Sequence, residues 1–229
     1  TLTVSSAASD VYKRQTPMDL SEIAGLKPGD VPGYDSRAID NWNVGSIKMS
    51  DVLLFSSIAV PGLLMFDQEI RSDYRNFSLV WAQSIFLTLG FTNFTKVLVG
   101  RPRPYLYADN ASDDYKLKKD NRKSFFSGHT SISAVSWFLM ASMYEDYKPG
   151  SNILPYLWTS AFLVPAYTAY CRYDAGKHFL LDVVAGYLVG SAIGILVPKW
   201  YTNNSNNTVN LSFILQPTGK IKTRLTYEF

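Results

Sequence analysis

Five apolar blocks fill the middle of this 229-residue chain, and they constrain its fold more than any other feature. They cover residues 52–66, 77–99, 130–144, 153–170 and 179–197. Their lengths lie between those of buried core helices and those of membrane spans, which need about 20 apolar residues. The sequence therefore predicts an all-α fold, an antiparallel helical bundle of about five long helices, and favours a bundle that spans a membrane.

The last apolar block is the strongest candidate for a membrane span. It carries no charged residue after Asp182, and glycine recurs at every fourth position, at Gly186, Gly190 and Gly194. Small residues at this spacing let a second helix approach closely. A helix inside a soluble bundle is the alternative that the same pattern fits.

The regions that flank the blocks are polar and rich in turns. Residues 16–50 contain the breakers Pro28-Gly29-Asp30 and Pro32-Gly33, which predict an irregular or interfacial lead-in. Residues 51–200 form the predicted helical domain. Residues 201–229 begin with an Asn-rich linker and continue as two runs of alternating apolar residues, a pattern typical of a short β-hairpin with its turn at residues 217–219.

The first 15 residues have a separate interpretation. Residues 10–15 read D-V-Y-K-R-Q, which can be back-translated as the end sequence of a transposon used to prepare sequencing libraries. We therefore expect residues 1–15 to be a non-native scar. In that case the natural amino terminus is missing from this sequence.

Composition argues against two classes of protein. The formal charge of +3 is mild, and the basic residues gather in motifs and in one run from Lys116 to Lys123 rather than along a helix face. Nucleic-acid binding is therefore not expected. The single cysteine, Cys171, rules out an intrachain disulfide and a cysteine metal cluster.

Both histidines of the chain lie in motifs whose residues bind phosphate well. The motifs are K-x6-R-P at residues 96–104, S-G-H at residues 127–129 and R-x5-H-x3-D at residues 172–182. If each apolar block is a helix and neighbours are antiparallel, all three motifs meet at one end of the bundle. This conclusion depends only on the number of blocks, and it predicts a single site.

The three motifs, in this order, resemble those of the type 2 phosphatidic acid phosphatase (PAP2) and vanadium haloperoxidase superfamily. The resemblance covers residues 96–182. Two positions depart from the family pattern, since Phe126 stands where the family usually has Pro and Cys171 where it usually has Ser. Neither position carries the chemistry, so the departures bear on the subfamily more than on activity.

The resemblance implies a metal-independent phosphatase that works through a phosphohistidine. His178 would be the nucleophile, and His129 would protonate the leaving oxygen and later activate water. Asp182 lies four residues after His178, so on one helix its carboxylate could accept a hydrogen bond from the ring. The residues expected to bind the substrate phosphate are Lys96, Arg103, Ser127, Gly128 and Arg172.

No metal or other cofactor is expected, because the cationic side chains neutralise the phosphate oxygens and no carboxylates have metal-ligand spacing. Vanadate is expected to inhibit. The first hypothesis is a membrane-embedded lipid phosphatase that acts on a phosphate or diphosphate headgroup, with a phosphorylated lipid and the membrane as partners. The alternatives are a soluble exported acid phosphatase, a vanadate-dependent haloperoxidase and a non-enzymatic membrane scaffold. The motifs predict neither the headgroup nor the oligomeric state.

The expected location is a bacterial cell membrane that the chain crosses several times, with the active site facing the periplasm. This orientation rests on the resemblance, because bacterial lipid phosphatases of this family usually face that side. The basic run from Lys116 to Lys123 lies on the motif side and opposes the usual excess of positive charge in cytoplasmic loops.

Overall fold

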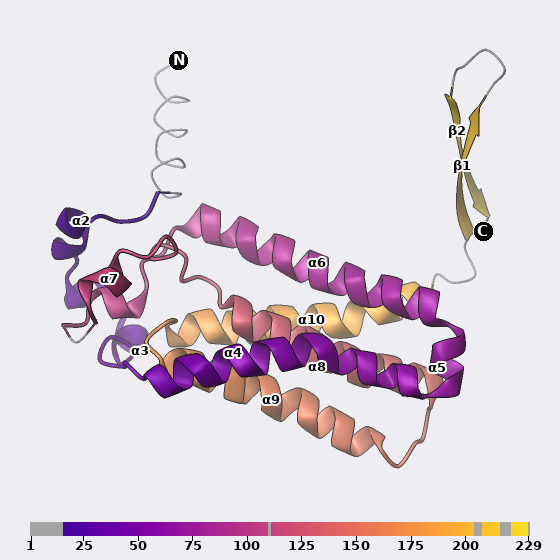
Figure 1. Ribbon diagram of the computed structural model, residues 1–229, viewed down its shortest axis with the longest axis horizontal. Helices are drawn as coiled ribbons and strands as arrows, with labels where there is room; N and C mark the ends of the chain where they lie inside the picture. Colours follow the sequence, from indigo (N-terminus) through magenta and orange to yellow (C-terminus); the bar gives the residue numbers. More distant parts are fainter. Residues whose placement is uncertain (1–15, 110, 204–207, 216–220, 229) are drawn as a thin grey trace.

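The structure is a computed structural model, and it describes residues 16–109, 111–203, 208–215 and 221–228. Within these residues, five helices of 16 residues or more run along the molecule (Figure 1). They are α4 (Val44–Ala59), α6 (Tyr74–Val99), α8 (Gly128–Tyr147), α9 (Leu154–Asp174) and α10 (Leu180–Asn203). α4 begins before the predicted start at residue 52.

Shorter helices join the long ones in the same described residues. The α-helices among them are α2 (Leu20–Ala24), α3 (Gly33–Ser36), α5 (Gln68–Ser72) and α7 (Asp113–Lys116). The 3₁₀ helices are η1 (Pro28–Asp30), η2 (Val60–Phe66) and η3 (Pro104–Leu106). The predicted count of about five therefore covers the long helices and misses the short ones.

Local sequence signals fix the ends of the helices that carry the motifs. Asn43 caps α4 by accepting a hydrogen bond from the N–H of Gly45, and Ser127 caps α8 through the N–H of Thr130. α6 ends at Gly100, whose φ of 58° is a left-handed conformation that glycine adopts without strain. The chain leaves α6 there and enters the R-P-R-P string.

α8 is the central helix of the bundle, because it packs against α4, α6, α9 and α10. Its Ser133 hydroxyl lies 2.9 Å from that of Ser57 in α4, and its Ser131 hydroxyl lies 3.2 Å from that of Thr92 in α6. Small polar side chains thus let four helices surround α8, and the hydroxyls of Ser131 and Ser133 are paired with neighbouring helices. The buried small residues of α8 are Thr130, Ser131, Ser133, Ala134, Ser136, Ala141 and Ser142.

The glycine stripe of α10 faces α8. A Cβ atom on Gly186 would lie 2.6 Å from the carbonyl oxygen of Ser127. A Cβ atom on Gly190 would overlap the carbonyl oxygen of Ser131. The predicted close approach of a second helix is confirmed. Because of it, Ser127 of the S-G-H motif packs directly against Gly186 of α10.

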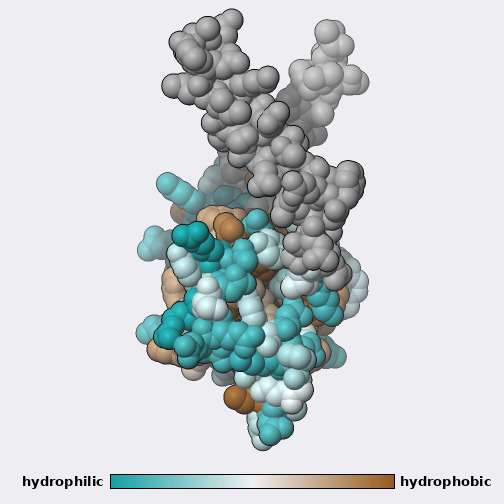
Figure 2. Space-filling view, turned by 90° about the vertical axis from the view of Figure 1, so that its right-hand side faces the viewer, coloured by the Kyte–Doolittle hydropathy of each residue, from teal (hydrophilic) through white to brown (hydrophobic). Residues whose placement is uncertain are grey.

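Three stretches of the described residues are long and apolar enough to cross a membrane, namely Val44–Phe66, Tyr74–Leu106 and Leu180–Thr202. Large apolar side chains lie exposed on them, among them Phe55 and Phe86, with exposed fractions of 70% and 72%. The end of the bundle that faces the viewer in Figure 2 is mostly hydrophilic. Apolar sides next to a polar end are typical of a protein that associates with a membrane.

The polar lead-in contains three short helices that the sequence did not predict, and it covers the end of the bundle where the motifs lie (Figure 1). Met18 and Ile23 share an apolar cluster with Tyr105 and Leu106 of η3. The side-chain amide of Asn121 exchanges two hydrogen bonds of 2.9 Å with the backbone of Met18. The lead-in is therefore packed onto the loop that joins α6 to α8.

The chain after α10 contains two strands. β1 (Thr208–Leu215) pairs with β2 (Ile221–Glu228) in antiparallel register, from Thr208 opposite Glu228 to Leu215 opposite Ile221. The turn predicted at residues 217–219 and most of the predicted linker lie outside the described residues. The predicted scar at residues 1–15 lies outside them too.

Candidate active site

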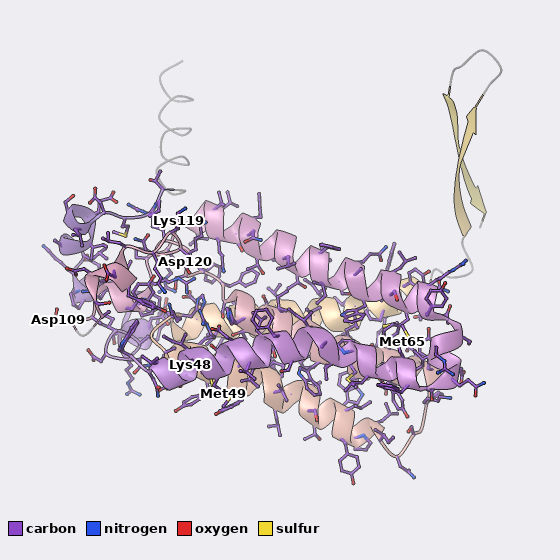
Figure 3. The ribbon with its side chains drawn as sticks, viewed as in Figure 1. Lys48, Met49, Met65, Asp109, Lys119 and Asp120 are labelled. Atoms are coloured by element: carbon purple, nitrogen blue, oxygen red, sulfur yellow. The ribbon has the colours of Figure 1, made fainter. Side chains whose placement is uncertain are left out.

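Four long helices bring the three motifs to one end of the bundle. α6 and α9 end there, and α8 and α10 begin there (Figure 1). The loop between α6 and α8 lies at the same end, since Figure 3 shows Lys119 and Asp120 on the side of the molecule where Lys48 marks the beginning of α4. The antiparallel order of the helices is the reason that motifs far apart in the sequence meet.

His178 lies in the short link between α9 and α10 and is fully buried. Its Nδ1 atom is 2.7 Å from the carbonyl oxygen of Ser124. Because a carbonyl oxygen only accepts, Nδ1 carries the hydrogen and Nε2 keeps its lone pair. Burial and the charges of Arg103 and Arg172 hold the pKa of His178 well below its usual range. The ring is therefore a neutral imidazole, and its Nε2 accepts a long hydrogen bond of 3.4 Å from Nη1 of Arg103.

The hydrogen bond expected between His178 and Asp182 is not formed, because Nδ1 and Oδ2 are 3.8 Å apart. α10 begins at Leu180, so His178 precedes the helix and the two side chains do not share a helical face. The carboxylate instead accepts hydrogen bonds from the Phe179 N–H at 3.0 Å and the Ser124 hydroxyl at 2.5 Å. Asp182 therefore reaches His178 indirectly, through Ser124.

Arg101 connects Asp182 to the lead-in. Its Nη1 lies 2.7 Å from Oδ1 of Asp182. Its Nη2 lies 2.7 Å from Oδ2 of Asp35 in α3. Asp35 is fully buried, and its second oxygen accepts the N–H of Leu181. The sequence analysis missed both residues. The signal for Arg101 was its position inside the first motif, whereas nothing in the lead-in marks Asp35.

Arg103 and Arg172 are buried beside His178. Arg103 donates to the carbonyl and the carboxylate of Asp120 and to the carbonyl of Lys177. Arg172 donates through Nη1 to the Ser50 hydroxyl at 3.2 Å. Its Nε is buried and has no hydrogen-bond partner among the described residues. A buried donor in this state is costly, so it favours an acceptor such as a phosphate oxygen.

Lys96 reaches the start of α8. Its Nζ lies 3.4 Å from the position that a Cβ on Gly128 would take, so the glycine leaves room for the ammonium group. Ser127 is buried, and its hydroxyl oxygen accepts hydrogen bonds from the N–H and the hydroxyl of Thr130. The N–H of Ser127 donates to the carbonyl of Asp182. A lysine beside the N-terminus of a long helix is an arrangement that favours anions.

His129 stands in the first turn of α8 and pairs with Asp51 of α4, with 2.9 Å between Nε2 and Oδ1. The two side chains are 25% and 49% exposed, so this histidine lies on the open side of the site while His178 lies on the buried side. The sequence analysis missed Asp51. It is the last charged residue before the first apolar block, and nothing near it in the sequence links it to the S-G-H motif.

Lys177 is a further buried lysine that the sequence analysis did not assign. Its Nζ lies 3.8 Å from the ring centroid of Tyr115 and 4.9 Å from that of Tyr105. Burial and the charges of Arg103 and Arg172 lower its pKa to about 6. A pKa this low leaves Lys177 largely neutral at pH 7, so the positive charge that attracts an anion comes from Arg103 and Arg172.

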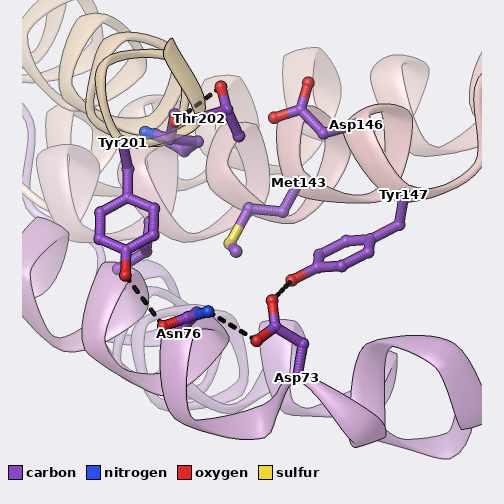
Figure 4. Close-up of a pocket in the computed structure, with 9 residues that line it drawn as sticks. Asp73, Asn76, Met143, Asp146, Tyr147, Tyr201 and Thr202 are labelled. Carbon is purple, nitrogen blue, oxygen red and sulfur yellow. Dashed lines mark hydrogen bonds between the residues drawn. The ribbon is translucent and has the colours of Figure 1, made fainter. Parts of the chain in front are cut away.

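Two cavities elsewhere contain none of the predicted site residues. One, of about 230 Å³, lies at the opposite end of the bundle, where Tyr147 donates a hydrogen bond to Asp73 and Tyr201 donates one to Asn76 (Figure 4). The other, of about 480 Å³, is an apolar groove between α9 and α10. The groups that could bind and transfer a phosphoryl group are gathered at the motif end.

Comparison with known proteins identifies the family. The chain belongs to the PAP2 superfamily, whose profile matches residues 78–206. A PA-phosphatase related-family protein of Dictyostelium discoideum is 29% identical over 156 residues, which cover 64% of this chain and 58% of that protein. Phospholipid phosphatase 1 of Rattus norvegicus is 28% identical over 135 residues, which cover 49% of this chain and 47% of that protein.

The chain thus spans about half the length of the curated relatives it matches. Among solved structures, the crystal structure of Aquifex aeolicus LpxE aligns with a TM-score of 0.45 and 22% identity. That alignment covers 66% of this chain and 84% of the other. At this level of similarity it supports no detail of the site.

Proposed function

We propose that this protein is a phosphatase that hydrolyses a phosphate or diphosphate ester of a membrane lipid through a phosphohistidine at Nε2 of His178. The observation that carries the proposal is the neutral, buried imidazole of His178, whose Nδ1 is held by Ser124 and whose Nε2 lies beside Arg103. Membership of the PAP2 superfamily and two relatives named as phosphatases support this reaction class.

In the first half of the reaction, Nε2 of His178 attacks phosphorus in line with the leaving oxygen. The N–P bond forms as the P–O bond to the leaving group breaks. His129 gives its proton to the leaving oxygen, so the product does not depart as a strongly basic alkoxide. The cations that balance the charge on the nonbridging oxygens are Lys96, Arg103 and Arg172.

In the second half of the reaction, water attacks the phosphorus of the phosphohistidine. His129, now neutral, takes a proton from that water, the N–P bond breaks, and inorganic phosphate leaves. His178 returns to its neutral form with the hydrogen on Nδ1. Asp182 supports the ring through Ser124, while Ser127 and Gly128 shape the start of α8 that receives the anion.

The proposed substrate is a phosphorylated lipid, because the site lies at the end of apolar helices, where a lipid headgroup meets water. Three candidate spans and exposed apolar side chains favour this substrate over the small phosphoesters of a soluble exported acid phosphatase. We infer several passes through a bacterial cell membrane, with residues 51–200 as the catalytic domain. The proposed orientation toward the periplasm rests on the family resemblance.

The proposed reaction needs no metal ion, because three cationic side chains neutralise the oxygens that a metal would otherwise bind. Among the described residues, no group of three or more His, Cys, Asp or Glu side chains could hold a metal. Orthovanadate should inhibit, since it adopts the five-coordinate geometry of the transferring phosphoryl group. Activity lost to EDTA and restored by magnesium would contradict this mechanism.

The test is rapid-quench labelling of the full chain in detergent with a ³²P-labelled phosphatidic acid. The wild-type protein should give a label that is stable in alkali and lost in acid, as phosphohistidine is. His178→Ala should give no label and no phosphate release while remaining folded. Lys119→Ala, an exposed change in the loop at the same end, is the control that should behave like wild type. Label retained in His178→Ala would place the nucleophile elsewhere.

A further inference from the structure

The pair formed by His129 and Asp51 joins two parts of the chain that are 78 residues apart. α4 supplies the carboxylate, and α4 packs against both α8 and α9. The residue before Asp51 is Ser50, whose hydroxyl oxygen accepts a hydrogen bond from Arg172. α4 therefore contacts both groups through adjacent residues: Asp51 contacts His129, the proposed acid, and Ser50 contacts Arg172, a proposed phosphate-binding residue.

Protonation of His129 is opposed by its surroundings. Burial and the charges of Arg172 and Arg103 lower the pKa of His129 to about 3, while the hydrogen bond to Asp51 acts in the opposite direction. Nearby positive charges disfavour an imidazolium ion, whereas a carboxylate in hydrogen-bond contact favours it. The reaction proposed above requires His129 to hold a proton until the leaving oxygen takes it. A carboxylate at 2.9 Å from Nε2 favours that proton.

We propose that Asp51 is a positioning residue for this reaction, which raises the proton affinity of His129 and fixes its ring. The proposal rests on the proposed function above. Oδ1 of Asp51 accepts the Nε2 hydrogen, so Nδ1 is the nitrogen left to face the leaving oxygen. When the leaving oxygen takes the Nδ1 proton, the ring becomes neutral, and the remaining hydrogen stays on Nε2, hydrogen-bonded to Asp51. In the second half of the reaction Nδ1 receives a proton from water, and the same carboxylate stabilises the cation that forms.

A structural role alone would have a different signature. The Asp51 side chain is 49% exposed, so loss of its charge should change the stability of the fold little. Its effect should instead appear in the protonation of His129 and in the step that needs this proton. The protonation of His129 and the rate of the step that needs its proton can each be measured separately from the stability of the fold.

The first measurement is a titration followed by NMR of the full chain in detergent micelles with isotope-labelled histidine. Only two imidazoles contribute signals, and His129→Ala assigns them. Asp51→Asn should lower the pH midpoint of the His129 titration by about one unit, a tenfold loss of proton affinity. Asp114→Asn, which removes an exposed carboxylate at the same end, should leave the midpoint unchanged. An unchanged midpoint in Asp51→Asn would overturn the proposal.

The second measurement compares an alkyl phosphate with p-nitrophenyl phosphate, whose leaving group needs little protonation. Asp51→Asn should lower kcat for the alkyl ester by about 10- to 100-fold, lower it much less for the activated ester, and move the alkaline limb of the pH profile to lower pH. Asp51→Glu should restore part of the loss. In a His129→Ala background, Asp51→Asn should add little, because the residue acts through His129.

The outcomes separate the two proposals. Equal losses for both esters, or additive losses in the double variant, would show that Asp51 does not act through His129. A wild-type chain that releases no phosphate from any ester would instead overturn the proposed function. The NMR titration would still decide, in that case, whether Asp51 controls the protonation of His129.

Discussion

At the scale of single residues, the main chain orients the proposed nucleophile. A carboxylate next to a catalytic imidazole is the usual way to hold one nitrogen protonated and leave the other free. Here the carbonyl oxygen of Ser124 takes that place, and Asp182 holds Ser124 by accepting its hydroxyl hydrogen. A carbonyl is uncharged, so it fixes the tautomer of His178 without favouring the imidazolium ion.

This geometry leads to a prediction about pH. Burial and the charges of Arg103 and Arg172 lower the pKa of His178 well below its usual value of about 6.5, so the ring should remain neutral in mildly acidic solution. The histidine NMR signals of the full chain should show no titration of His178 between about pH 7.5 and about pH 5.5. A midpoint near 6.5 would mean that the ring is not buried among cations.

A second prediction at this scale concerns Asp182. Asp182→Asn removes a buried charge that pairs with Arg101, which keeps its contact with Asp35. We expect the free energy of unfolding to fall by roughly 1–3 kcal/mol, because buried partners are left imperfectly paired. Phosphate release should fall less than in His178→Ala, since the Ser124 carbonyl remains. Thermal melting and phosphate release measured on the same preparations would check both.

The control for this variant is Asp113→Asn, an exposed carboxylate in α7. It should change neither the melting temperature nor the rate. Complete loss of activity in Asp182→Asn without loss of stability would mean that the carboxylate acts on His178 directly, in a geometry that the structure does not show.

The sequence predicted which residues gather at the motif end better than it predicted the hydrogen bonds and ion pairs between them. The three motifs located both histidines and the main cations, because residue spacing and the alternation of helices are visible in the sequence. The contacts of Asp35 and Asp51 could not be predicted, because each depends on how a distant helix packs. The hydrogen bond expected between His178 and Asp182 was wrong for a local reason, namely that α10 begins at Leu180, two residues after His178.

At the scale of elements, the contact between α8 and α10 leaves no room for a side chain at Gly186, Gly190 or Gly194. The glycine stripe let the sequence predict that some helix approaches α10 closely, because an absent side chain is itself the signal for close approach, but it did not indicate that this helix is α8. The short helices of the lead-in gave no such signal. They carry few apolar residues, and their packing onto η3 depends on contacts across the chain such as Met18 with Tyr105.

A pair of glycine substitutions tests this element. Gly190→Ala places a methyl group against the carbonyl oxygen of Ser131 and the Cβ of Ala134, so α10 must move away from α8. We expect a loss of roughly 1–3 kcal/mol in stability, together with a lower rate. Gly90→Ala on α6 is the matched control, because a Cβ there meets nothing within 4 Å. It should be neutral or slightly stabilising.

The melting temperatures of the two variants in the same detergent give the comparison. Equal stability of both variants would show that the helices are not in the close contact described. A destabilised Gly190→Ala with full activity would show that the site does not depend on the spacing of α8 and α10.

At the scale of the whole molecule, the two ends of the bundle differ in chemistry. The motif end carries buried cations under the folded lead-in, and the other end holds the polar contacts of Asp73 and Asn76 with two tyrosines. Apolar faces lie between them on three candidate spans. A bundle of this kind in a membrane must place its two ends on opposite sides.

Cysteine labelling of intact cells of a bacterial host tests this arrangement. Lys119 lies in the loop at the motif end, and Asn152 lies in the loop between α8 and α9 at the other end; both are exposed. The native Cys171 is buried, so the unaltered chain is the background control. We expect a membrane-impermeant maleimide to label Lys119→Cys in intact cells and to label Asn152→Cys only after the cells are permeabilised.

The basic run from Lys116 to Lys123 makes this a demanding test, because positive charge near a span favours the cytoplasmic side. Two residues of the run have partners on the protein, since Arg122 pairs with Glu22 at 2.6 Å and Lys118 lies over the ring of Tyr115. Charges held in this way should weigh less on orientation than free ones. Labelling in the reverse order would place the site on the cytoplasmic side. Labelling of both positions in intact cells would contradict a bundle that crosses the membrane.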